Sequence, residues 1–168
     1  FEDDPITAGL VVTIEETDVD AEPSPVTPIA LAGLSNEQIR AYTKFLRAAK
    51  KPAIIAAEDV HWDNASAELE KLAAALGAPV YAAPYTGVLP IASTSPAYAG
   101  YLPPSLKQVA DRLAKHDALL FVGGRGLRNT LYSDAQLPQR KAWLGHDATA
   151  MAPDGEYRIA TVTHLKTA

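Results

Sequence analysis

Glycines and arginines gather directly after an apolar run in the second half of the chain. Residues 118–122 read "ALLFV", and the next residues read "GGRGLR". Glycine permits a positive φ and lets the backbone approach a ligand closely, while arginine can fork onto phosphate oxygens. Gly123, Gly124, Arg125 and Arg128 are therefore candidate nucleotide-binding residues. The alternative is a strand-ending turn with solvated arginines. Both stay open, because "GGRG" departs from the G-x-G-x-x-G fingerprint.

An acidic pair, Glu58 and Asp59, follows a second apolar run, "AIIAA". A carboxylate at the end of a strand could hold a ribose hydroxyl, or it could cap a nearby helix or remain solvated. The four histidines share wide spacing and lack a paired ligand pattern: His61, His116, His146 and His164. Structural or surface roles are therefore expected for them, and no metal site is assigned.

Four tyrosines surround a long, turn-rich stretch, "YTGVLPIASTSPAYAGYLPP": Tyr81, Tyr85, Tyr98 and Tyr101. They could stack on an adenine or isoalloxazine ring, or they could pack this loop onto the sheet. The chain has no G-x-S-x-G elbow, Walker A run or H-E-x-x-H motif. The sequence therefore lacks the motifs that would indicate a serine hydrolase, a P-loop nucleotide-binding protein or a zincin, and no catalytic residue is assigned.

Helices and strands alternate from Ser35 to the end of the chain. Ser35 and Gln38 have the spacing of a capping box, and apolar residues recur at helical intervals through residue 50. Asp63 or Asn64 could cap a second helix that ends at Gly77. A third helix is expected to open at Ser105. The strands are expected at 53–57, 79–84, 118–124, 141–146 and 157–163. Continuous apolar strands between amphipathic helices predict a parallel, doubly wound sheet covered on both faces.

The first 34 residues have a different character. "GLVVTIEET" could be a strand with one apolar face. Pro23, Pro25 and Pro28 then recur at short intervals, which is typical of a linker. Residues 1–34 are accordingly predicted to be an N-terminal extension and interdomain linker, and residues 35–168 a single domain. Both ends look cut from a longer polypeptide.

The overall composition narrows the function classes. A net charge of −5 over 168 residues argues against a nucleic-acid partner, which would need a basic surface. No apolar run approaches the ~20 residues of a membrane span. The chain contains no cysteine, so it has no disulfide and no thiol nucleophile. A cytoplasmic location fits this composition.

The stretch from "KPAIIAAEDV" through "LAAALGAPVYAAP" resembles the central domain of thiamine-diphosphate-dependent enzymes, most of all that of the benzoylformate decarboxylases. After the Ala83–Pro84 corner, Pro90, Pro96 and Gly100 fall where such domains place Pro, Pro and Gly. "LAKHDALLFVGG" is similar to the strand "HD-apolar-GA" of this family. The resemblance runs from about Ser35 to Thr163.

The resemblance implies a three-layer α/β/α fold with a six-stranded, mostly parallel, Rossmann-like sheet. It implies a structurally linking role in a decarboxylase or lyase that acts on a 2-oxo acid, with no catalysis by this domain alone. Thiamine diphosphate and Mg²⁺ would be held by flanking pyrimidine-binding and diphosphate-binding domains, in a homo-oligomer.

A further implication concerns nucleotides, since some members bind FAD or ADP on this domain. In flavin-binding acetolactate synthases an arginine follows the strand-end glycines, as Arg125 does here, and a second follows, as Arg128 does. Those enzymes carry His-Pro where this chain has Ser95–Pro96. This departure places the chain nearer the decarboxylase branch and leaves FAD or ADP binding as the alternative.

Overall fold

The computed structural model describes residues 33–124, 127, 137–138, 140–146 and 157–168. Six strands form one sheet in the order β3-β2-β1-β4-β5-β6, and all five neighbouring pairs are parallel. The elements are α1 (Asn36–Arg47), β1 (Pro52–Ala56), α2 (Asp59–Trp62), α3 (Ser66–Leu76), β2 (Val80–Ala82), β3 (Tyr98–Tyr101), α4 (Leu106–Leu113), β4 (Ala118–Val122), β5 (Lys141–Gly145), β6 (Ile159–Val162) and the 3-10 turn η2 (Leu165–Thr167). The expected parallel sheet is confirmed. The predicted strand near residue 12 and the proline-rich linker lie outside the described residues.

Helices pack on both faces of the sheet, so the fold has three layers. Side chains of α1 and α3 pack on one face, where Leu46 and Leu69 meet Leu120. Residues of α4 pack on the opposite face, where Val109 and Leu113 join a cluster with Phe121 and Trp143. Alternate residues of each central strand point to opposite faces. The strands β1, β4 and β5 are therefore buried along their whole length.

Local chemistry sets the start of α1 and the end of α3. The capping box at α1 is present, since Ser35 Oγ accepts from Gln38 N at 3.2 Å and Gln38 Oε1 accepts from Ser35 N at 2.8 Å. Gly77 ends α3 in the left-handed conformation at φ 58°. The expectation that Asp63 or Asn64 caps α3 is wrong: Ala65 precedes the first helical residue and gives no side-chain cap.

The loop after β2 contains a strand that the sequence did not predict. Residues 98–101 form β3, which pairs with β2 through a register shift between Val80 and Ala82. It is an edge strand of only partly buried residues, "YAGY", with Gly100 at φ 92°. Its short, glycine-containing sequence gives no alternating pattern, so only pairing with β2 defines it.

Polar contacts fix the amino ends of β1 and β4. The Asp117 carboxylate accepts hydrogen bonds from the backbone N–H of Lys50 and Lys51 at 2.7 and 2.9 Å. Arg140 donates to the carbonyls of Phe45 and Ala48 at the end of α1, where a cation also complements the helix dipole.

No helix in the described ranges has the length and apolar character needed to traverse a bilayer.

Candidate functional site at the carboxyl edge of the sheet

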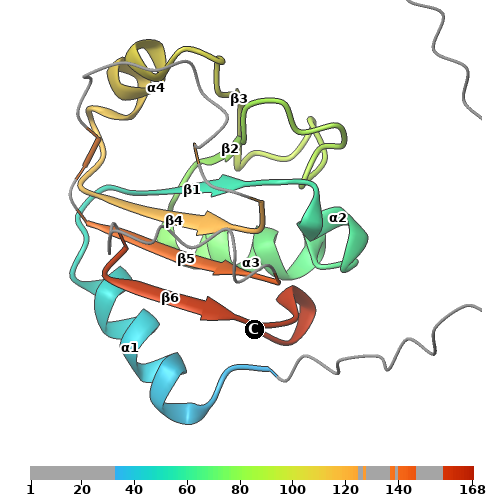
Figure 1. Cartoon of the computed structure of the whole chain (residues 1–168), viewed down its shortest axis with the longest axis vertical. Coiled ribbons are helices and arrows are strands. Elements are labelled where there is room, and N and C mark those ends of the chain that lie inside the picture. The colour runs from blue at the N-terminus through green and yellow to red at the C-terminus, as the bar shows by residue number, and fades with distance from the viewer. Residues whose placement is uncertain (1–32, 125–126, 128–136, 139, 147–156) are drawn as a thin grey trace, which may run out of the picture.

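The carboxyl ends of the strands meet at one edge of the sheet. In Figure 1 the arrowheads of β1, β4, β5 and β6 point to the same side, where α2 and the C-terminal turn lie. The chain runs from β1 to β2 in one direction across the sheet, and β4 to β6 extend in the other. The order of the strands thus reverses between β1 and β4, which is where doubly wound sheets bind ligands. The acidic pair after β1 and the glycines after β4 flank this point.

Gly123 and Gly124 have the conformation that the sequence predicts, with φ angles of 71° and 60°. Their backbone N–H groups are both used within the chain. Gly123 N donates to Leu144 O at 2.6 Å, and Gly124 N donates to the Asp59 carboxylate. The Trp143 indole N–H also points to Gly124 O, at 3.3 Å. Arg125 and Arg128, the other two candidate nucleotide-binding residues, lie outside the described residues.

Close packing explains why both positions need glycine. A Cβ at Gly123 would lie 2.6 Å from Asp59 Oδ2, and one at Gly124 would lie 2.6 Å from the Ala57 Cβ. The close approach predicted for these glycines is therefore an approach to the turn after β1. This contact brings the ends of β1 and β4 together.

Glu58 and Asp59 bind backbone and hydroxyl groups of neighbouring turns. Glu58 Oε2 accepts from Thr86 Oγ1 at 2.5 Å and from Gly87 N at 3.3 Å, in the turn after β2. Asp59 accepts from Gly124 N in the turn after β4. Neither carboxylate caps α2. The acidic pair thus links the ends of three adjacent strands.

A second cluster lies beside this turn and was missed by the sequence analysis. Asp63 Oδ2 accepts from His146 Nε2 at 2.6 Å and from Leu165 N at 2.7 Å, while His164 Nε2 lies 3.7 Å from Asp63 Oδ1. The second nitrogen of His146, Nδ1, is 3.8 Å from Asp59 Oδ1. One signal could have found this cluster: His146 ends one predicted strand and His164 directly follows another, and parallel strands bring their carboxyl ends to one edge.

The electrostatics of Asp63 follow from these partners. Burial raises the pKa of Asp63, but hydrogen bonds from His146 and the Leu165 N–H, with the charges of both imidazoles, outweigh burial and hold it below its ordinary value. Among the described residues, no group of three or more potential ligands has the arrangement of a metal site. The cluster therefore ties the loop before α3 to the ends of β5 and β6.

The predicted tyrosines and His116 lie at separate places in the fold. Tyr81 is buried and its hydroxyl lies 3.3 Å from His116 Nε2, at the amino end of β4. Burial, the largest effect, lowers the pKa of His116. Tyr85 is 63% exposed, and Tyr101 lies at the end of the edge strand. The four tyrosines are thus spread over β2, the loop after it and the two ends of β3.

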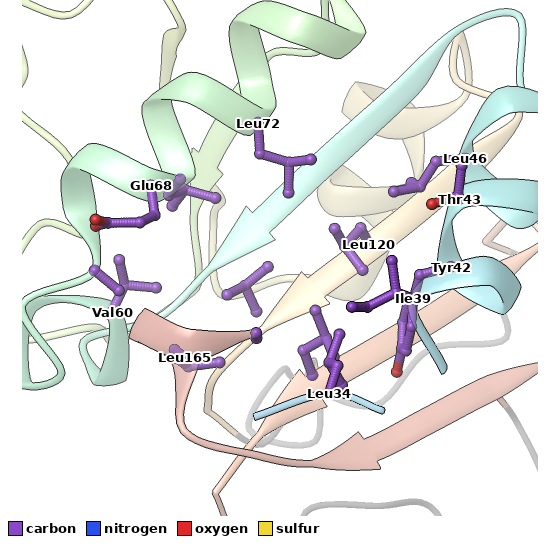
Figure 2. A pocket seen from close by; sticks show the side chains of 15 residues that line it. Leu34, Ile39, Tyr42, Thr43, Leu46, Val60, Glu68, Leu72, Leu120 and Leu165 are labelled. Atoms are coloured by element: carbon purple, nitrogen blue, oxygen red, sulfur yellow. The ribbon is translucent and has the colours of Figure 1, made fainter. Parts of the chain in front are cut away.

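An apolar pocket of about 290 Å³ opens between α1 and α3 (Figure 2). Ile39 and Tyr42 line it from α1, Leu72 from α3 and Leu120 from the sheet below. Both ends of the described chain border it, since Leu34 and Ala168 are among its lining residues. Its lining is mostly aliphatic, with the aromatic ring of Tyr42 and the polar side chains of Thr43 and Glu68 as the exceptions. It lies on the face of the sheet, and the glycine turn is not part of its lining.

Residues 39–160 match the family model described as "Thiamine pyrophosphate enzyme, central domain". The match covers more than half of the chain. The chain belongs to this family. The sequence-based identification of the central domain, and the fold that it implied, are therefore confirmed.

Three solved structures share the fold of this central domain. A thiamine diphosphate-dependent 4-hydroxybenzoylformate decarboxylase from Rhodococcus jostii RHA1 is 27% identical, with a TM-score of 0.75 over 84% of this chain and 27% of that chain. A putative thiamin diphosphate-dependent enzyme from Mycobacterium smegmatis is 22% identical, with a TM-score of 0.71 over 87% of this chain and 29% of that chain. Benzoylformate decarboxylase from Polynucleobacter necessarius is 19% identical, with a TM-score of 0.73 over 89% of this chain and 29% of that chain.

This central domain spans less than a third of the length of these enzymes. The family implies thiamine diphosphate as its cofactor and a multidomain, typically oligomeric setting. The described residues do not fit that cofactor, however. Glu58 and Asp59, the acidic side chains at this edge, already accept hydrogen bonds from protein groups.

Proposed function

We propose that this chain is the linking central domain of a thiamine-diphosphate-dependent carboxy-lyase that acts on a 2-oxo acid of the benzoylformate type. The likeness to the Rhodococcus decarboxylase supports this class of parent enzyme, because it combines 27% identity with a TM-score of 0.75. In this proposal the domain spaces and orients its neighbours and performs no step of the reaction.

The main support for the proposal is the hydrogen bonding at the carboxyl edge of the sheet. At the reversal point between β1 and β4, the Asp59 carboxylate takes the Gly124 N–H that would otherwise face a ligand. Glu58 takes the Gly87 N–H in the same way. These hydrogen bonds join the turns at the edge to one another, and such an arrangement suits a domain whose role is to hold a fixed shape.

Further parts of the proposal concern the rest of the protein. We place thiamine diphosphate and Mg²⁺ between flanking pyrimidine-binding and diphosphate-binding domains, with residues 1–34 as the linker and 35–168 as the central domain. We also propose a homo-oligomer in the cytoplasm, for which the absence of cysteine is compatible evidence.

A domain exchange tests the proposed role. This chain replaces the central domain of the Rhodococcus 4-hydroxybenzoylformate decarboxylase, and the exchanged enzyme is assayed for assembly and for decarboxylation. We expect decarboxylation with the substrate preference of the recipient, because the flanking domains would carry the chemistry. The 168-residue chain alone, given thiamine diphosphate, Mg²⁺ and benzoylformate, should release no carbon dioxide. Turnover by the isolated chain would refute a linking role.

The alternative is an ADP- or FAD-binding module that uses Gly123, Gly124, Arg125 and Arg128. The positive φ angles of the two glycines at the reversal point favour it, while the occupied N–H groups oppose it. Isothermal titration with ADP, ADP-ribose and FAD separates the two functions. Heat of binding from any of them would favour the nucleotide module, and its absence with all three would dismiss that module.

A further inference from the structure

The Asp59 carboxylate lies where a bound anion would lie in a glycine turn. Gly123 and Gly124 both adopt a positive φ at the end of β4. Gly123 N donates to Leu144 O, so the Gly124 N–H is the group of this turn that meets an anion, as backbone N–H groups in such turns can. Here the anion is a side chain of the same molecule, since Asp59 Oδ2 accepts from Gly124 N. The contact is close enough that a Cβ on Gly123 would also meet this carboxylate.

The second oxygen of this carboxylate faces a potential cation. Asp59 Oδ1 lies 3.8 Å from His146 Nδ1, and the other nitrogen of that imidazole is bonded to Asp63. Because a carboxylate only accepts, His146 Nε2 must donate to Asp63. A protonated His146 then carries its second N–H on the side of Asp59. The Asp59 side chain is 19% exposed, so this position is reached by solvent.

We propose that Asp59 is an internal anion that closes an oxyanion-binding turn, and that removing its side chain opens this turn to small carboxylates and phosphates. The binding groups would be the Gly124 N–H and the imidazole of His146. With Asp59 in place, an incoming phosphate meets both an occupied N–H and a like charge. This inference concerns contacts within the 168-residue chain and does not depend on the proposed role in a lyase.

Anion rescue of Asp59→Ala tests the proposal. Thermal unfolding of the wild-type chain and of the variant is followed in sodium chloride, formate and phosphate at one ionic strength. Loss of the carboxylate leaves the Gly124 N–H without its partner, so D59A should unfold at a lower temperature in chloride. Formate and phosphate should each raise its Tm by about 3 °C or more, as ligands of the folded state do when present well above Kd. The wild-type Tm should move by less than a third as much.

Two controls separate specific binding from general salt effects. Asp59→Asn keeps an oxygen that can accept from Gly124 N, so its Tm should respond to the anions as the wild type does. Asp111→Ala removes an exposed aspartate that pairs with Lys107 on the same helix, and it should show no anion-specific shift. In a ¹H–¹⁵N spectrum, phosphate should shift the Gly124 amide signal of D59A and leave that signal in place in the wild type.

Measuring the Tm of D59A in ADP tests whether the opened turn binds phosphate as a free ion or as part of a nucleotide. If ADP raises the Tm of D59A no more than inorganic phosphate does, the opened turn binds an oxyanion alone. A larger effect of ADP would show that the opened turn binds a nucleotide through its phosphate, and either result supports the proposal.

Equal anion responses in D59A and wild type would overturn it. If D59A does not fold in chloride, Asp59→Ser is compared in the same salts. Failure of formate and phosphate to restore or stabilise either variant would overturn the proposal as well.

Discussion

Removing the Asp63 carboxylate should strongly destabilise the fold, although this side chain lies outside every regular element. Its Oδ2 accepts two hydrogen bonds, from His146 Nε2 at 2.6 Å and from Leu165 N at 2.7 Å. The side chain is only 10% exposed, so water can replace these partners poorly. Hydrogen bonds to charged groups each contribute about 1.5–3 kcal/mol. We therefore expect Asp63→Ala to lower the free energy of unfolding by about 3 kcal/mol.

The measurement is chemical and thermal unfolding at pH 7. A loss of this size should lower the Tm by about 6–12 °C in a chain of this length. Asp63→Asn keeps one acceptor oxygen, so it should lose about half as much. Asp111→Ala is the matched control, because this aspartate is 69% exposed and should change stability by less than about 0.5 kcal/mol. A D63A chain as stable as the control would refute the role assigned to this cluster.

The pH dependence adds an independent check. The folded state holds the pKa of Asp63 below its ordinary value. The stabilisation from this carboxylate is thus complete above the unfolded pKa of about 3.9, and it is lost as the pH falls through the lower folded value. His146, His164 and Asp59 are the titratable groups that face Asp63 or its imidazole partner. The difference in stability between wild type and D63N should therefore shrink below about pH 4. A difference that grows on acidification through this range would contradict the assigned sign.

Three further substitutions test single contacts. Tyr42→Phe removes a hydroxyl that donates to Trp143 O at 2.5 Å and should cost about 1–2 kcal/mol in denaturant unfolding. Burial raises the pKa of Tyr42 to about 12, so the hydroxyl should stabilise the fold fully below about pH 10 and less as the pH rises toward 12. Comparing the stability of wild type and Y42F at alkaline pH would reveal this loss. Gly124→Ala should destabilise more than Gly77→Ala, whose new Cβ would meet nothing within 4 Å, so equal losses in thermal unfolding would contradict the close packing at Gly124. Tyr85→Gly should stabilise by up to about 1 kcal/mol, since this residue adopts φ 62° with an exposed side chain, and a lowered Tm would show that the ring makes a needed contact.

Much of the fold was predictable because local signals agreed with the global pattern. Ser35 and Gln38 specify the start of α1 through their own side chains, and Gly77 ends α3 through its own backbone. The apolar strands β1, β4 and β5 are buried on both faces, so their composition alone marks them. The edge strand β3 has no such composition and depends on its neighbour.

The candidate site was predictable only in part. The positions after β1 and β4 followed from the parallel order, and the positive φ angles of Gly123 and Gly124 followed from their lack of a side chain. The partner of Gly124 did not follow, because Asp59 lies 65 residues earlier and nothing local distinguishes it from a solvated acid. The helix-cap assignment for Asp63 failed for the same reason, since its partners are 83 and 102 residues away.

The sequence by itself determined the alternation of helices and strands, the parallel sheet and the family to which the chain belongs. These features depend on periodicity, on capping groups and on an ordered series of short motifs, all of which are written along the chain. The tertiary structure decided how the polar groups at the carboxyl edge are used. Whether an N–H meets a ligand, water or a carboxylate depends on which segments the fold makes neighbours, and such segments can be far apart in the chain, as Gly124 and Asp59 are.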